Sequence, residues 1–188
     1  MTKSKIQSDL GYVRELVRAS DKDPTSRAIY LLWAAIVLVG FSMVDFAPRY
    51  VGFFWMAAGP LGGIFSGILG CRHSRERGQV RSDVGMRHML HWSGMLVLVG
   101  LATLLAVKGH LDSPTLSKVI LLIVTYGWWT AGVHFDRNFL FLGGVMAAGF
   151  VMILFYPHYA WTALGAVIAI VLSIIAFRKG ASDVTQEA

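Results

Sequence analysis

The sequence predicts an all-α membrane protein whose six transmembrane helices form three hairpins. Three observations support this fold class. Hydrophobic residues make up 55% of the 188 residues and charged residues only 15%, which is too apolar a balance for a soluble domain of this size. Long segments contain no Lys, Arg, Asp or Glu, and a helix needs about 20 apolar residues to cross the hydrocarbon layer. Lys and Arg are concentrated in alternate connections, as in multi-pass proteins.

Four uncharged segments each have the length of one span, and a fifth is long enough for two. Asn138–Phe177 contains Pro157 near its middle. Because proline cannot continue a helix without losing a hydrogen bond, this segment is predicted to form two helices. The single spans are predicted at Ala28–Val44, Tyr50–Cys71, His88–Val107 and Val119–Phe135.

The distribution of Lys and Arg predicts the orientation. Residues 1–27, the segment 72–87, Arg137 and the C-terminal pair Arg178 and Lys179 together hold 14 of the 17 cations. Positively charged connections stay on the cytoplasmic side. We therefore expect a protein of the inner (plasma) membrane with both termini cytoplasmic. This topology also accounts for the net charge of +6, so no nucleic-acid partner is expected.

The chain is predicted to have three parts: a cytoplasmic N-terminal segment (1–26), a transmembrane domain (27–178) and a cytoplasmic tail (179–188). In the first part, apolar residues recur every three or four positions from Ile6 to Val17, with basic residues among them. This spacing predicts a short amphipathic helix. Such a helix lies on the inner leaflet or docks a cytoplasmic protein partner.

Internal similarity indicates that the hairpins are repeats. Gly40, Gly100 and Gly149 lie within similar short sequences in the first, third and fifth predicted helices. These glycines are followed after 32, 34 and 29 residues by Arg72, His134 and Arg178. The three hairpins are thus similar in length, and we expect them to point the same way around a pseudo-threefold axis.

The second predicted helix carries two neighbouring stripes of small residues. One consists of Gly59, Gly63 and Gly67, and the other of Gly62, Ser66 and Gly70. In lipid, small residues let helix backbones approach closely. We expect the stripes to pack against other helices. The alternative is a helix broken near Pro60, whose freed carbonyls line a substrate or ion site.

Histidines gather at the predicted cytoplasmic helix ends and form the main candidate site. His88 and His91 share one helical face, and His134 ends the facing helix of that hairpin. Imidazole, thiolate and carboxylate are the ligands that Zn²⁺ selects. The candidate metal ligands are His88, His91, His134, Asp136, Cys71 and His73. Haem held between His91 and His134 is the second candidate cofactor, and anchoring of helix ends at headgroup depth is the alternative role of these residues.

Ionisable residues are scarce within the predicted spans. Asp45, at the outer end of the first helix, is expected to pair with Arg49, four residues away. This scarcity disfavours a pump that relays protons through buried carboxylates. The sequence also contains no Walker loop, dinucleotide-binding fingerprint or nucleophile elbow, which disfavours a conventional enzyme.

These observations predict a small, non-enzymatic, homo-oligomeric membrane protein that acts as a channel, a transporter component or a stress-response accessory. One alternative is a membrane-embedded metal- or haem-binding protein that uses the histidine-rich rim. Another is a membrane sensor or partner-docking subunit. The arginine-rich 72–87 loop is expected to bind anionic lipids, since each cation near the surface contributes about 1 kcal/mol.

Overall fold

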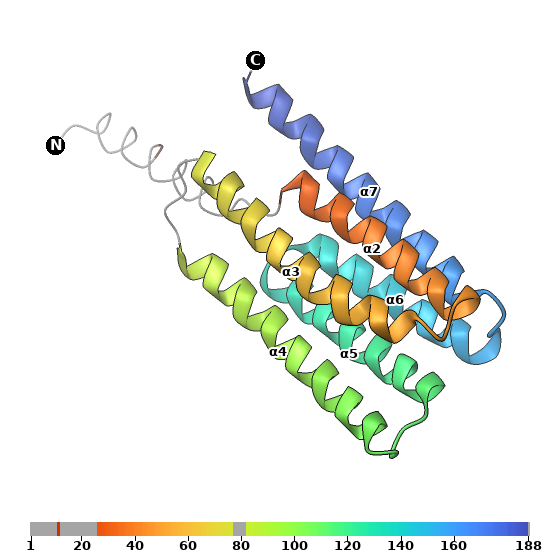
Figure 1. Cartoon of the computed structure of the whole chain (residues 1–188). Coiled ribbons are helices and arrows are strands. Elements are labelled where there is room, and N and C mark those ends of the chain that lie inside the picture. Colours follow the sequence, from red (N-terminus) through yellow and green to blue (C-terminus); the bar gives the residue numbers. More distant parts are fainter. Residues whose placement is uncertain (1–10, 12–25, 77–81, 188) are drawn as a thin grey trace.

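The computed structural model describes residue 11, residues 26–76 and residues 82–187 (Figure 1). The predicted amphipathic N-terminal segment, apart from Gly11 and Ser26, lies outside the described residues, as do residues 77–81 of the basic loop. Over the rest of the chain the structure is helical and contains no strand.

Six helices in the described ranges are long and apolar enough to cross a membrane, which confirms the predicted number. This is the composition of a multi-pass membrane protein. The helices are α2 (Arg27–Phe46), α3 (Val51–Glu76), α4 (Ser82–Val107), α5 (Ser113–His134), α6 (Arg137–Phe155) and α7 (Ala160–Glu187).

Local capping explains where two of these helices begin. The side chain of Asp112 accepts a hydrogen bond from the backbone N–H of Thr115, and Pro114 lies in the first turn. Both features favour a helix start, so α5 begins six residues before the predicted Val119. Asp136 caps α6 in the same way. By contrast, α3 continues through Pro60 without interruption, and α7 continues past the predicted end of the last span.

The helices pack side by side in the order α3, α2, α7, α6, α5, α4, and among the described residues the backbone of each helix comes close only to the backbones of its neighbours in that order. The pair α2 and α7 forms the most extensive interface, followed by the pair α5 and α6. Of the six described helices, α3 packs against α2 alone and α4 packs against α5 alone. α3 and α4 are consecutive in sequence, yet they lie at opposite ends of this order, and their backbones do not come close to each other.

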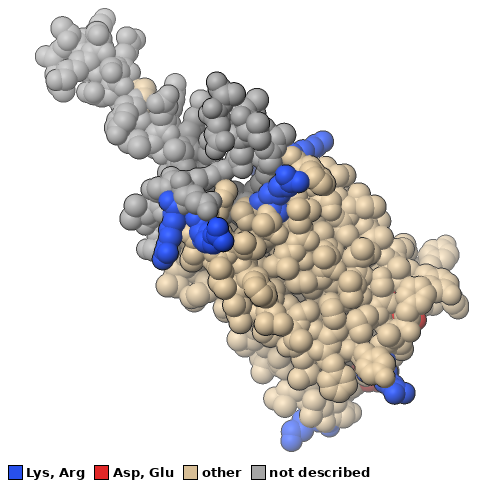
Figure 2. Space-filling model, turned by 45° about the horizontal axis from the view of Figure 1, so that its top comes forward, with Lys and Arg blue, Asp and Glu red and all other residues tan. Residues whose placement is uncertain are grey.

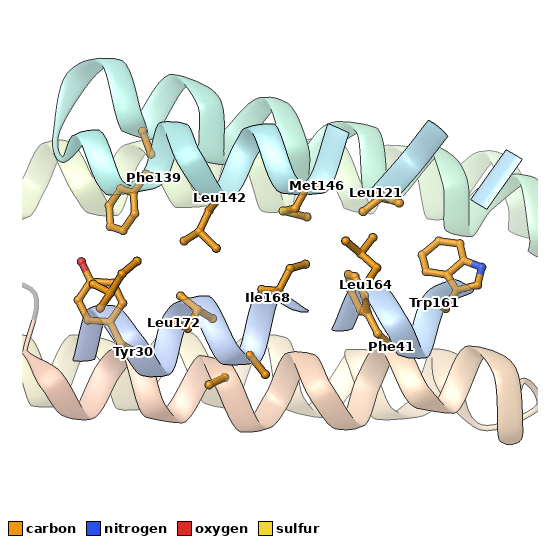
Figure 3. Close-up of a cluster of buried hydrophobic side chains, with 14 of the residues drawn as sticks. Tyr30, Phe41, Leu121, Phe139, Leu142, Met146, Trp161, Leu164, Ile168 and Leu172 are labelled. Carbon is orange, nitrogen blue, oxygen red and sulfur yellow. The ribbon is translucent and has the colours of Figure 1, made fainter. Parts of the chain in front are cut away.

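The apolar core lies where α2 and α7 face α6 and α5 (Figure 3). Leu142 of α6 and Leu172 of α7 are its largest fully buried side chains. Ser26 is the one buried polar residue in the described part of the chain. The centre of the bundle is thus filled by apolar side chains.

Glycines allow the central helix pairs to approach closely. A Cβ added to Gly165 of α7 would lie 2.7 Å from the Cβ of Phe41 in α2. A Cβ added to Gly143 of α6 would lie 3.0 Å from the backbone nitrogen of Trp129 in α5. Larger residues at these two positions would push the helices apart, as expected for membrane helices that associate through close packing.

Candidate functional site at the basic end

One end of the bundle carries most of the described arginines, and we call it the basic end. There α2, α4 and α6 begin and α3, α5 and α7 approach their ends. Its arginines are Arg27, Arg72, Arg75, Arg87, Arg137 and Arg178. On the face shown in Figure 2, Lys and Arg lie at the two ends of the molecule and leave an uncharged band between them. Such a band matches the hydrocarbon layer of a membrane.

His88 and His91 of α4 both contact Phe135, the residue that follows α5. The His88 ring stacks on Phe135 with centroids 3.8 Å apart. The His91 ring meets Phe135 edge-on at 5.5 Å. The predicted common face of these two histidines therefore exists, and it packs on an aromatic ring that the sequence analysis did not single out.

His91 also makes a hydrogen bond across the α4–α5 interface. Its Nε2 lies 2.9 Å from the carbonyl oxygen of Gly127. Because a carbonyl oxygen only accepts, Nε2 must carry the proton and donate. In the neutral ring, the lone pair that a metal can use is then on Nδ1. The imidazole thus links α4 to α5 through this hydrogen bond.

Asp136 has a structural role in the turn between α5 and α6. Its Oδ1 accepts a hydrogen bond from the backbone N–H of Asn138 at 3.0 Å, and its Oδ2 accepts one from the side-chain amide of Asn138 at 3.2 Å. Tyr30 of α2 donates to the same Oδ2 at 3.4 Å. The carboxylate therefore caps α6 and ties it to α2.

A continuous series of ring contacts crosses the bundle near the basic end. Tyr30 contacts Phe139 at 6.2 Å, Phe139 contacts Trp128 at 5.1 Å, and Trp128 contacts Trp92 at 5.1 Å. Trp92 then contacts His91 at 5.0 Å. Aromatic pairs in such tilted arrangements each contribute roughly 0.5–1.5 kcal/mol beyond their burial. The series links α2, α6, α5 and α4. Sequence reasoning missed it because interfacial aromatics in a membrane protein equally indicate contact with lipid.

The other predicted ligands are less close together. Cys71 and His73 lie near the end of α3, which contacts neither α4 nor α5. His134 is exposed, and its ring lies 6.4 Å from Phe135. Over the described residues, no three His, Cys, Asp or Glu side chains are grouped so that they could hold a metal ion. Metal binding, haem binding at His91 and His134, and partner docking through residues 1–26 stay predictions.

At the opposite end of the bundle, Asp45 does not show the expected pairing with Arg49. Its Oδ2 accepts from the backbone N–H of Thr162 at 2.8 Å and from the Thr162 hydroxyl at 2.6 Å. The Arg49 guanidinium instead lies over the Tyr50 ring, 5.3 Å from its centroid. A carboxylate from α2 thus caps the first turn of α7, because the amides at a helix start lack partners within the helix.

The two small-residue stripes of α3 differ in what they contact. The stripe that includes Gly62 and Ser66 faces α2, where the Trp33 indole lies against Gly62 and donates to the Ser66 hydroxyl at 2.9 Å. The other stripe is open: a Cβ added to Gly59, Gly63 or Gly67 would meet no described residue within 4 Å. The expected close packing is therefore present on one side of α3 alone.

No known protein family, curated protein or solved structure matches this chain. What places it in a class is its own architecture, six apolar helices of membrane-spanning length.

Proposed function

We propose that this protein is a non-enzymatic subunit of a homo-oligomeric membrane assembly, and that it acts as a channel or transporter component or as a stress-response accessory. The observation that supports this proposal most directly is the position of α3 and α4. Among the described helices each packs against a single neighbour, and no described residue covers a stripe of three glycines on α3. Membrane helices associate through such small-residue faces.

The bonding of the ionisable side chains supports a non-enzymatic role. General acid–base catalysis needs a group that can exchange a proton with a substrate. Asp45 caps α7 and Asp136 caps α6, while His91 clamps α4 to α5. These three groups hold helices together.

The packing of the core bears on where a transport path would run. Conduction through one chain requires polar groups along a pore. Between α2, α7, α6 and α5 the centre is filled by apolar side chains such as Leu142, Ile168 and Leu172 (Figure 3). A path for ions or small solutes would therefore lie between copies of the chain.

The test is the stoichiometry and permeability of the intact protein. We would extract it directly from its membrane into polymer-bounded nanodiscs and measure its mass by native mass spectrometry. We expect a homo-oligomer. A companion measurement follows ion and solute flux in liposomes. A strictly monomeric protein that passes no ion or solute would overturn the proposal.

We further propose three hairpins of like orientation with both termini, residues 1–26 and the 179–188 tail in the cytoplasm. The cation bias toward the basic end supports this orientation. Cys71 offers a direct test because it is exposed at that end and is the lone cysteine of the chain. A membrane-impermeant maleimide should label it in inside-out vesicles and leave it unlabelled in intact cells. The reverse pattern would contradict the proposed orientation.

Anionic lipids are the proposed partners of the 72–87 loop. Arg72, Arg75 and Arg87 lie on the two helices that flank its centre, and basic groups beside the membrane attract acidic headgroups. Replacing these three arginines with glutamine should lower the amount of acidic lipid that co-purifies. Unchanged lipid content would exclude this role.

Metal binding is a second candidate function, favoured by the convergence of His88 and His91 on one aromatic ring. Zinc content of protein purified without chelator tests it, with the double variant His88→Ala/His91→Ala as the comparison. One zinc per chain that is lost in the variant would support the site. Wild-type protein with no zinc and no haem absorption band would exclude it.

A further inference from the structure

We infer that two copies of this chain pair face to face, with α3 of each copy packed against α4 of the other. This inference rests on the proposed function and names the partner as a second copy. The open face of α3 and the exposed face of α4 would then cover each other twice in one dimer.

The α2–α7 pair shows what kind of contact α3 lacks. When Arg72 of α3 is aligned with Arg178 of α7, Gly59 corresponds to Gly165 and Gly63 to Ala169. The next positions, Gly67 and Ser173, are also both small. In α7, Gly165 receives Phe41 of α2. The same pattern of small residues on α3 receives no side chain from the part of the chain that the structure describes.

The first helices of the three hairpins are α2, α4 and α6, and they differ in how far the same face is covered. When Gly40, Gly149 and Gly100 are aligned, Tyr30 of α2 corresponds to Phe139 of α6 and to Leu90 of α4. The first two side chains are 2% and 4% exposed, whereas Leu90 is 61% exposed.

One turn further along these helices the difference recurs. Ala34 of α2 is buried, and Gly143 of α6 lies against Trp129. Gly94 of α4, the corresponding residue, faces open space. The face of α4 that matches the buried faces of α2 and α6 is therefore uncovered.

The order of contacts identifies the missing pair. Both extensive interfaces join the second helix of one hairpin to the first helix of another, α7 to α2 and α5 to α6. The remaining pair of this kind is α3 and α4, whose backbones do not come close to each other within one copy. A further α3–α4 pair would continue an interface type that the protein already uses twice.

A second copy can supply this pair through a single two-fold axis. Because α2 with α7 faces α5 with α6 across the core, α3 and α4 extend from the same side of the molecule (Figure 1). A two-fold axis along the membrane normal places α3 of one copy opposite α4 of the other, and the reverse. Two-fold dimers are the commonest protein oligomers, and their interfaces are self-complementary.

Cysteine cross-linking tests the predicted contact. By analogy with Gly165 and Phe41, Gly59 should face Leu101 of the second copy. In a Cys71→Ser background, Gly59→Cys and Leu101→Cys are introduced into two differently tagged chains that are co-expressed and oxidised in the membrane. We expect a disulfide-linked dimer carrying both tags. The matched control replaces Leu101→Cys with Val151→Cys, an equally exposed position on α6, and should give none.

Bulky substitutions give a second, independent test. Gly63→Leu should weaken dimer formation by tenfold or more, where each tenfold is about 1.4 kcal/mol. Gly144→Leu on α6 should not change it. A Cβ at either glycine meets no described residue of the same chain within 4 Å, so both variants should fold and differ in association alone.

The outcomes separate this inference from the proposed function. A disulfide within one chain of the double variant Gly59→Cys/Leu101→Cys, with no linked dimer, would show that α3 and α4 close on each other and would overturn the inference. An oligomer that is insensitive to Gly63→Leu would overturn the inference and leave the proposed function standing. A strictly monomeric protein without flux would overturn both.

Discussion

The α2–α7 pair and the α3–α4 pair are both made of antiparallel apolar helices, yet they differ in burial. In the most apolar part of α7, 44% of the residues are buried, against 6% in α3 and 6% in α4. Overall apolar character does not explain the difference, because all six helices are apolar enough to span a membrane. The difference lies in whether small residues meet a partner. In lipid, where apolar surface is already solvated, packing decides which helices associate.

The largest predicted loss of stability comes from placing a large side chain in the contact between α2 and α7. Gly165→Leu should lower the free energy of unfolding by about 1–3 kcal/mol or more, because its Cβ would lie 2.7 Å from that of Phe41. Thermal unfolding in a detergent that keeps the protein monomeric measures it. Gly63→Leu, at the open stripe of α3, is the matched control and should leave the unfolding temperature unchanged. Equal losses in both variants would contradict the contrast between the two pairs.

Removing the carboxylate that caps α7 should have the next largest effect. Asp45→Ala leaves the Thr162 amide and hydroxyl without their acceptor, and loss of a helix cap costs about 0.5–2 kcal/mol. Thr162→Val retains the amide donor and should lose less stability than Asp45→Ala. Chemical unfolding of both variants provides the measurement. An Asp45→Ala protein as stable as the wild type would show that α2 and α7 do not depend on this cap.

The attachment of α3 to α2 should depend on one indole. Trp33 donates to Ser66 at 2.9 Å, and a hydrogen bond of this kind contributes about 0.5–1.5 kcal/mol. A double-mutant cycle with Trp33→Phe and Ser66→Ala should give a coupling energy in that range. A coupling energy near zero would mean that packing of the Trp33 ring on Gly62 alone holds the two helices together.

The smallest effect should be a pH dependence at the start of α5, the one described helix against which α4 packs. The hydrogen bonds from Thr115 hold the pKa of Asp112 below its usual range. A carboxyl whose pKa is lowered by folding adds stability above its unfolded pKa, about 3.9, and that stability is lost as the pH falls through the lower native pKa. The difference in unfolding temperature between wild type and Asp112→Ala should therefore be present at pH 7 and disappear in strong acid. A difference that persists in strong acid would contradict this account.

The number of helices and their approximate bounds could be predicted because uncharged runs of about 20 residues have one common explanation in this composition. Which neighbouring helix each helix face contacts could not be predicted from the sequence. Both stripes of α3 have the same chemistry, and only the packing of Trp33 against Gly62 distinguishes them.

The candidate site shows the same limit. The pairing of His88 with His91 follows from their spacing, but Phe135 between them does not. Asp45 was expected to bond Arg49 within its own helix turn, and its real partner, Thr162, lies 117 residues away. Contacts between distant segments depend on helix arrangement, which an amino-acid pattern along one helix does not encode.

The separation of Asp45 and Thr162 also has a consequence for biogenesis. The first and last helices form the most extensive interface, so that interface cannot assemble until the final helix has left the ribosome. At roughly 5–20 residues per second, the 117 residues that separate the two contacts take about 6–23 s to synthesise. Throughout that interval the uncovered face of α2 is available to membrane chaperones, and a chain truncated before α7 would keep that exposed face for its whole lifetime.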